Sequence, residues 1–303
     1  MNIQIKPLHE QITAWSENYV PEKDLFFLRE EDLKIVANDL AGTLVIPRDE
    51  FSNHTSYNKI QWVNSYETWT ISRYAQFVIV AEPNWITSLS RTTKEALFHI
   101  QHKAGRGLIF PISYFSETEA LPEDYVIHEA NEQFVIIQHN MWMELPNRYK
   151  EELLSTYAKL WDEWTSTISP TSLPAHLKKY ANTFSANPGS NCLGAVLYAI
   201  SSNPIKDEWI IHEWVHGETF AMGLQNASYL QTDERFQAND VVVWVNEEEV
   251  IQHAAYCIDG DLFFNKNGQT FFNPWKIVHG DELMKEWEKY RSRVYRKSSP
   301  SRI

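Results

Sequence analysis

The sequence predicts an α+β protein of two domains. Its 303 residues are enough for about two domains, each with its own core. Residues 1–145 mix short strand-like runs, such as Phe77–Ala81, with an amphipathic helix over Thr92–Lys103. Beyond residue 240, strand-like runs follow one another closely and are separated by Asp-Gly and Asn-Gly turns, which is typical of an antiparallel meander.

Composition and charge exclude several classes of protein. Apolar residues make up 43% of the chain and aromatic residues 14%, which excludes collagen, coiled coil and disorder. The formal net charge of −13 argues against a nucleic-acid partner. No apolar stretch approaches the ~20 residues that span a bilayer, and the N-terminus lacks the apolar core of a secretory signal. Two cysteines are too few for a disulfide framework and fit a reducing compartment, so we expect a cytoplasmic protein. No membrane partner and no cofactor are expected. The sequence does not indicate the oligomeric state.

The first predicted domain covers residues 1–145, and residues 146–184 are predicted to form a helical bridge and linker. Apolar side chains recur at spacings of three and four over Asn147–Thr167, which predicts an amphipathic helix. Two prolines make Ser169–Pro174 the best linker candidate, and a helix over Ala175–Phe184 follows. Residues 185–303 form the second predicted domain.

The second domain contains most of the candidate chemistry. A buried helix is predicted from Cys192 to Ile200 and another over Glu218–Leu230. The predicted strands of the meander are Asp240–Val245, Val250–Ile258, Leu262–Lys266 and Thr270–Phe272. The chain then ends in a basic tail, with no acidic residue after Glu288. A solvated tail or helix end is favoured here over a contact with an acidic partner or with the protein's own acidic body.

Cys192 is the candidate nucleophile. A cysteine at a helix N-terminus meets free backbone N–H groups and the positive end of the helix dipole, which favour the thiolate and lower the pKa of the thiol. His253 follows 61 residues later, early in a predicted strand and next to two small residues, Ala254 and Ala255. An imidazole placed there could take the thiol proton. Asn265, on the next strand, could orient the ring, and Asn267 is the alternative for that role.

These residues resemble those of the NlpC-type cysteine peptidases, which belong to the papain-like superfamily. The resemblance covers about residues 185–280 and rests on the segments Asn191–Leu197, Asn239–Val245 and Gln252–Gly268. It implies a helix that carries the cysteine and packs on an antiparallel sheet. It also implies Cys192 as nucleophile, His253 as base and Asn265 as the orienting residue.

The resemblance implies an acyl-enzyme mechanism without a cofactor. The expected substrate is a short peptide or a peptidoglycan-derived amide, and Asn191, Asn267 and Trp244 are further candidates for the substrate cleft. Two other functions stay open on the same fold. One is a thiol acyltransferase, which passes the acyl group to an amine or alcohol, and the other is a binding module without catalysis.

A zinc metallopeptidase is the alternative of a different chemical class. His212, Glu213 and His216 form an H-E-x-x-H pattern. On a helix, this pattern places two imidazoles on one face to hold zinc and supplies a glutamate as general base. Gly217 and Glu218 follow where such helices usually continue with apolar residues, so a loop or helix start is favoured and no metal is expected.

Overall fold

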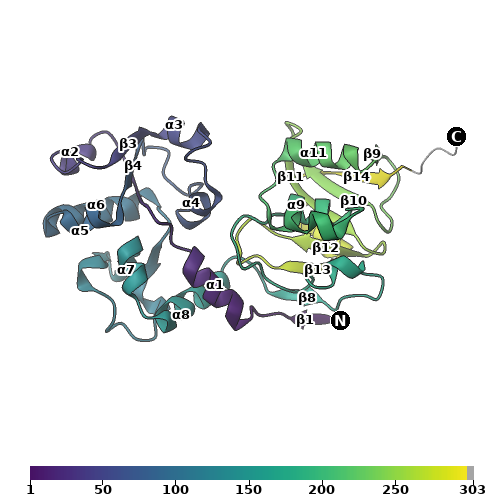
Figure 1. Cartoon of the computed structure of the whole chain (residues 1–303), viewed down its shortest axis with the longest axis horizontal. Helices are drawn as coiled ribbons and strands as arrows, with labels where there is room; N and C mark the ends of the chain where they lie inside the picture. The colour runs from purple at the N-terminus through teal and green to yellow at the C-terminus, as the bar shows by residue number, and fades with distance from the viewer. Residues whose placement is uncertain (299–303) are drawn as a thin grey trace. The chain divides into compact units, whose positions relative to one another are not determined.

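The computed structural model describes residues 1–298 and divides the chain into two compact units (Figure 1). The first, here called the sheet unit, combines residues 1–11 with the chain from Ala158 onward. The second, here called the inserted unit, consists of residues 12–157. Both units combine helices with antiparallel sheets, so the predicted α+β class is confirmed.

The inserted unit contains two three-stranded antiparallel sheets. Their strand orders are β2-β4-β3 and β5-β7-β6. The buried guanidinium of Arg106 donates to Leu25 O in the first sheet at 3.2 Å and to Ile137 O, just beyond the second, at 3.0 Å, and so ties the two together. The strands are β2 (Asp24–Leu28), β3 (Leu44–Pro47), β4 (Phe77–Ala81), β5 (Ile109–Pro111), β6 (Val126–Glu129) and β7 (Glu132–Ile136). The helices are α1 (His9–Asn18), which begins in the sheet unit, α2 (Leu33–Val36), α3 (Arg48–Asn53), α4 (Ile60–Ser65), α5 (Pro83–Ser88), α6 (Arg91–Ala104), α7 (His139–Glu144) and α8 (Asn147–Ala158), with the 3-10 turns η1 (Ile112–Tyr114) and η2 (Glu123–Tyr125).

The sheet unit is built on a six-stranded antiparallel sheet with the order β13-β12-β11-β10-β14-β9. Three of the predicted strands of the meander form β12, β11 and β10, and β13 takes the place of the fourth. A two-stranded sheet of β1 and β8 accompanies it. The strands are β1 (Asn2–Gln4), β8 (Thr165–Thr167), β9 (Tyr229–Thr232), β10 (Val241–Val245), β11 (Ile251–Cys257), β12 (Leu262–Lys266), β13 (Trp275–His279) and β14 (Arg291–Lys297). The helices are α9 (Cys192–Ala199), α10 (Pro204–Asp207), α11 (Gly217–Asn226) and α12 (Gly280–Glu286), with the 3-10 turns η3 (Ala175–Leu177) and η4 (Glu208–His212).

The six-stranded sheet is buried on both faces. Helices α9 and α11 cover one face, here called the helix face (Figure 1). The opposite face, here called the far face, is covered by α12 and by Trp287 and Phe236. Because both faces are apolar, the strands read as continuous apolar runs such as Val241–Val245 rather than as a clean alternation. The sequence therefore does not reveal which residues of a strand face the helices.

The structure divides the chain at positions that differ from the predicted boundaries of 145 and 185. The first strand, β1, pairs antiparallel with β8, and Asn2 lies opposite Thr167. This pairing brings the N-terminus into the sheet unit, and helix α8 closes the inserted unit. A contact between residues about 165 positions apart leaves no local pattern, so the sequence could not indicate it.

Four predicted elements have different limits in the structure. The predicted helix over Asn147–Thr167 ends at Ala158, and β8 occupies its last residues. In the predicted helix over Ala175–Phe184, only the 3-10 turn η3 forms. The predicted helix over Glu218–Leu230 ends at Asn226, because β9 begins at Tyr229. The last strand of the meander is β13 instead of Thr270–Phe272.

The basic C-terminal segment is a strand and not a solvated tail. β14 lies between β10 and β9 in the sheet. Its Arg296 donates to the buried carboxylate of Asp240, with Nη2 at 2.8 Å from Oδ2, and Arg291 and Arg293 pair with Glu249. The acidic body of the protein thus supplies the partners of these arginines. Arg302 lies outside the described residues.

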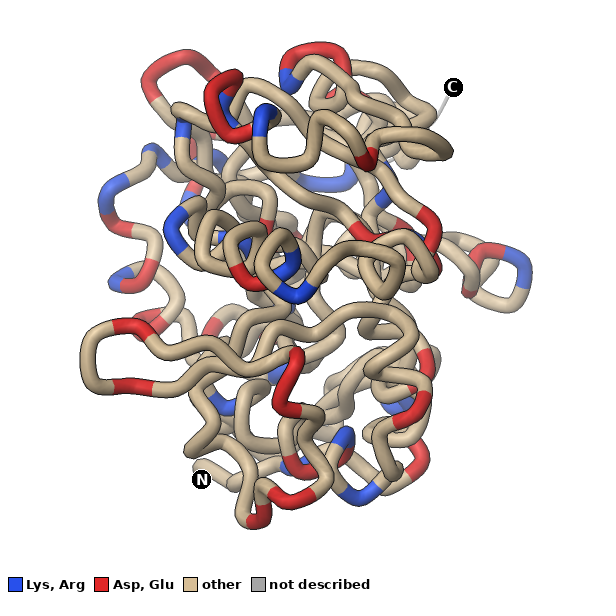
Figure 2. Tube along the Cα trace, turned by 90° about the vertical axis from the view of Figure 1, so that its left-hand side faces the viewer, with Lys and Arg blue, Asp and Glu red and all other residues tan. Residues whose placement is uncertain are grey.

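Charges of both signs are spread along the described chain, with acidic residues on many turns (Figure 2). No helix within residues 1–298 is long and apolar enough to cross a membrane.

Candidate functional site

Helix α9 presents Cys192 as its first residue. Asn191 is the N-cap: its Oδ1 accepts from Gly194 N at 2.9 Å, and its Nδ2 donates to Val215 O at 2.7 Å. The side chain therefore satisfies the helix start and also anchors the loop before α11. The half-buried Cys192 packs against the core on the helix face of the sheet.

Beneath Cys192, one row of residues crosses the helix face from strand to strand. The backbone N–H of Ala254, in β11, interacts with the Cys192 thiol. The β11–β12 register, which pairs Tyr256 with Phe264, places Lys266 across from Ala254 when it is continued. On the other side of Lys266, β13 contributes Trp275. The thiol thus interacts with the backbone N–H of an alanine and with the charge of a lysine in this row.

Lys266 is fully buried. Its Nζ donates to Thr270 O at 2.9 Å and to Asn273 O, and it lies over the Trp275 ring, 5.6 Å from the centroid. Burial lowers the pKa of Lys266 to about 7, against the opposing effects of the Asp162 carboxylate and of Cys192. Two carbonyl acceptors use both hydrogens of a neutral amine, so its lone pair stays available as a proton acceptor.

Burial controls the acidity of Cys192. It raises the pKa of the thiol to about 11 and outweighs the backbone N–H groups of Ala254 and Leu193 and the charge of Lys266, which act in the opposite direction. The expectation of a lowered pKa is therefore wrong for this structure. The thiol is protonated near neutral pH, and its activation needs a base close by.

The structure does not bring His253 to Cys192. In β11, Ala254 and Tyr256 face the helices, whereas Ala255 and Cys257 belong to the far-face core. His253 shares the far face: its ring stacks on Trp287 with centroids 4.1 Å apart and planes 2° apart. Trp244, a predicted cleft residue, lies on the same face, 5.5 Å from the imidazole.

A β-bulge in β11 determines which face of the sheet carries His253. Trp244 pairs with His253 and Val245 with Ile251, so Gln252 is an extra residue in a β-bulge. Side chains alternate along a strand, and a shift of one residue moves every side chain to the other face. Because both faces of β11 are apolar, the sequence does not indicate whether His253 or Ala254 faces Cys192.

His253 instead starts a chain of hydrogen bonds on the far side of the sheet. Its Nε2 donates to Asn265 Oδ1 at 2.7 Å, and Asn265 Nδ2 donates to Asn267 Oδ1 at 2.9 Å. Asn267 Nδ2 then donates to Glu286 Oε1 at 2.8 Å. Burial lowers the pKa of His253 to about 4, so the imidazole is neutral at pH 7. The structure thus brings His253, Asn265 and Asn267 together, but apart from the thiol.

The H-E-x-x-H segment does not form the helix that the zinc alternative requires. His212 ends the 3-10 turn η4, Glu213 is extended with φ −91° and ψ 150°, and His216 is the N-cap of α11. The two imidazoles therefore do not share a helix face. Among residues 1–298, no three His, Cys, Asp or Glu side chains are grouped in a way that could hold a metal ion.

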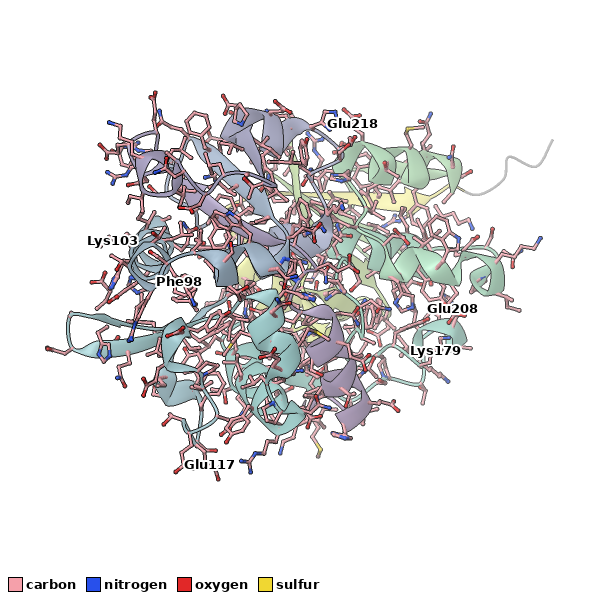
Figure 3. All side chains as sticks on the ribbon, turned by 60° about the vertical axis from the view of Figure 1, so that its left-hand side comes forward. Phe98, Lys103, Glu117, Lys179, Glu208 and Glu218 are labelled. Atoms are coloured by element: carbon pink, nitrogen blue, oxygen red, sulfur yellow. The ribbon has the colours of Figure 1, made fainter. Side chains whose placement is uncertain are left out.

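His212 belongs to a polar network on the helix face. Figure 3 shows Lys179 beside Glu208, and these two side chains form an ion pair. The Tyr180 hydroxyl donates to Glu208 Oε1 at 2.5 Å and lies 3.3 Å from His212 Nε2. Burial lowers the pKa of His212, and its ring packs edge-on against Trp275. The network flanks the row under Cys192 on the side of β13.

Lys266 is the residue that the sequence reasoning missed. The sequence contains a signal for this lysine, because side chains alternate along Leu262–Lys266 and Lys266 therefore shares a strand face with Leu262 and Phe264. A lysine on an apolar strand face is buried or paired, and a buried lysine has a lowered pKa. Of the predicted catalytic residues, only Cys192 interacts electrostatically with Lys266.

Comparison with known proteins adds no relative. No family model matches the chain, and no curated protein or solved structure matches it either. The resemblance to NlpC-type peptidases therefore stays a prediction from the residues, and the function has to be argued from the site.

Proposed function

We propose that the sheet unit is a cysteine hydrolase, a peptidase or amidase that acts on short peptide amides, and that Lys266 is the base for Cys192. One observation carries this proposal: a buried lysine with a pKa of about 7 is coupled to a cysteine at a helix N-terminus. Among bases for nucleophilic catalysis, lysines desolvated in this way are an established solution. The geometry supports this pairing in place of the predicted use of His253.

The reaction balances with these two residues. The neutral amine of Lys266 takes the proton of the Cys192 thiol, and the sulfur attacks the carbonyl carbon of the amide. Backbone N–H groups at the start of α9 stabilise the oxyanion. The ammonium of Lys266 then gives its proton to the leaving amine, which leaves a thioester. Water attacks the thioester with Lys266 again as base, the carbon–sulfur bond breaks, and the ammonium of Lys266 returns its proton to the Cys192 sulfur. One amide and one water thus yield an acid and an amine.

The energy of the first proton transfer is compatible with catalysis. Thiol and amine differ by about 4 pKa units, from about 11 to about 7, which corresponds to roughly 5 kcal/mol. An enzyme that turns over about ten times per second has a barrier of roughly 16 kcal/mol. The transfer therefore takes up about a third of the available barrier and leaves room for carbon–sulfur bond formation.

An activated ester tests the proposal without knowledge of the natural substrate. With p-nitrophenyl acetate, we expect a burst of nitrophenol equal to the protein concentration and an acetyl group mapped to Cys192. Cys192→Ala should lose the burst, and Lys266→Met should slow acylation by about a hundredfold or more at pH 7.5, the usual contribution of a general base. His253→Gln should be acylated at the same rate as the wild type, because His253 lies on the far face, away from Cys192.

The outcomes separate the alternative functions. Faster deacylation by glycinamide than by water would identify an acyltransferase instead of a hydrolase. Acylation of Cys192 that Lys266→Met leaves unchanged would remove Lys266 from the mechanism. Absence of acylation in the folded wild type would leave a binding module and end the proposal.

A further inference from the structure

A cavity lies in the sheet unit, and neither Cys192 nor Lys266 lines it. It has a volume of about 680 Å³, within the range of small-molecule sites. Its walls come from β1, β8, the segment before β8, β13 and α12, and from Asn267 after β12.

The floor of this cavity contains a buried ion pair with one unsatisfied oxygen. Lys276 Nζ lies 2.5 Å from Asp162 Oδ1, and only 8% and 3% of the two side chains are exposed. The other carboxylate oxygen, Asp162 Oδ2, is buried and has no hydrogen-bond partner. A buried carboxylate oxygen without a donor costs free energy, so a hydrogen-bond donor that reaches this atom would stabilise the site.

The rim of the cavity is acidic. Glu163, Glu282 and Glu286 line it, together with Lys159. With the ion pair included, four carboxylates face two lysines, so the cavity has an excess of two negative charges. Burial, Asp162 and Glu163 raise the pKa of Glu286, which shows that the cavity disfavours a further negative charge. A cation would relieve this repulsion.

Glu286 is held in position by the chain of hydrogen bonds from the far face. Its Oε1 accepts from Asn267 Nδ2, which is itself bonded to Asn265 and through it to His253. The second oxygen, Oε2, stays available to a ligand. His253 and Asn265, which were predicted as catalytic residues, thus belong to the hydrogen-bond chain that positions the Glu286 carboxylate at the rim.

Part of the remaining wall is apolar. Leu160, Trp161, Val278 and Leu283 line the cavity beside polar residues such as Asn2 and Thr165. A ligand that matches both parts has a hydrocarbon stem for this wall and a hydrogen-bond donor with positive charge for the carboxylates.

We propose that this cavity binds a small primary amine with an aliphatic stem, whose ammonium group contacts Asp162 Oδ2 and Glu286 Oε2. The cavity shares no lining residue with the thiol chemistry proposed above, because neither Cys192 nor Lys266 lines it. An ammonium group of this kind occurs in free amines and in lysine side chains of peptides, and two probes separate these sources.

Calorimetric titration of the full chain tests the proposal. The probes are n-pentylamine for a free amine and Nα-acetyl-L-lysine amide for a peptide side chain, with 1-pentanol and pentanoate as uncharged and anionic controls. We expect at least one amine to bind with a submillimolar dissociation constant and neither control to bind. The tighter of the two amines identifies the source, and Cys192→Ala should bind it unchanged.

Variants locate the binding site. Glu286→Gln should weaken amine binding by about tenfold, as expected for the loss of one charged contact. Glu288→Gln is the matched control, because Glu288 is exposed two residues further on and does not line the cavity. Asp162→Asn, checked for folding by circular dichroism, should weaken binding as well. The proposal would be overturned if neither amine binds or if the controls bind as tightly as the amines. Equal effects of Glu286→Gln and Glu288→Gln on amine binding would also overturn it.

Discussion

Replacing Lys266 by Met is expected to change the pH dependence of stability by about 3.5 kcal/mol between pH 7 and pH 10. Lys266 has a pKa of about 7 in the folded protein against 10.5 as its ordinary value. Between these values the unfolded chain binds a proton that the folded chain does not, so the wild type becomes more stable as the pH rises. Methionine lacks this proton, and the difference between the two proteins isolates Lys266.

Urea unfolding at pH 7, 8.5 and 10 measures this effect. The free energy of unfolding of the wild type should increase relative to Lys266→Met at each step. Lys285→Met is the control, because Lys285 is exposed on α12 and its charge stays in solvent. A constant difference between wild type and Lys266→Met would mean that Lys266 is charged throughout and serves only to tie Thr270 and Asn273 to β12.

The second large effect is a loss of stability in acid that originates at His253. Its pKa of about 4 in the folded protein lies below the ordinary value of 6.5, because the ring is buried against Trp287. Below pH 6.5 the unfolded chain gains a proton that the folded chain excludes. Stability should therefore fall by about 3 kcal/mol between pH 7.5 and pH 4 on account of this residue alone.

The variant His253→Phe keeps an aromatic ring on Trp287 and has no proton to gain. Its free energy of unfolding, measured in urea by near-ultraviolet circular dichroism, should depend less on pH than that of the wild type by this amount. His216→Phe is the control, since His216 is exposed in the same unit. Equal acid sensitivity of wild type and His253→Phe would show that the imidazole is protonated in the folded state.

Much of the fold was predictable because it depends on local patterns. The helix that starts at Cys192, the strands of the meander over residues 241–266 and the helix that ends before Gly105 all follow from hydrophobic periodicity and turn residues. The pairing of β1 with β8 and the place of β14 between β10 and β9 depend on contacts between distant residues. These carry no local signal in one sequence.

The candidate site was predictable only in part. Cys192 was predicted as the nucleophile and Lys266 was missed. The predicted pair His253 and Asn265 lies on the far face, where a hydrogen bond between neighbouring strands joins the two side chains. Which face of β11 carries the imidazole depends on one bulge residue, Gln252. In a sheet that is buried on both sides, no alternation in the sequence reveals such a shift.

The pH profile of Cys192 alkylation tests the central claim, that Lys266 accepts the thiol proton, most directly. Iodoacetamide labelling, followed by peptide mapping, gives the rate at Cys192 and at Cys257, a fully buried thiol on the far face. In the wild type, we predict that the rate at Cys192 rises up to about pH 7 and then levels off, because neutral Lys266 takes the thiol proton during the attack and the neutral fraction of Lys266 no longer increases above its pKa of about 7. In Lys266→Met the rate should keep rising about tenfold per pH unit through pH 9, because the buried thiol then reacts only through its own ionisation and has lost the Lys266 charge that lowers its pKa. Parallel profiles for the two proteins would contradict the account.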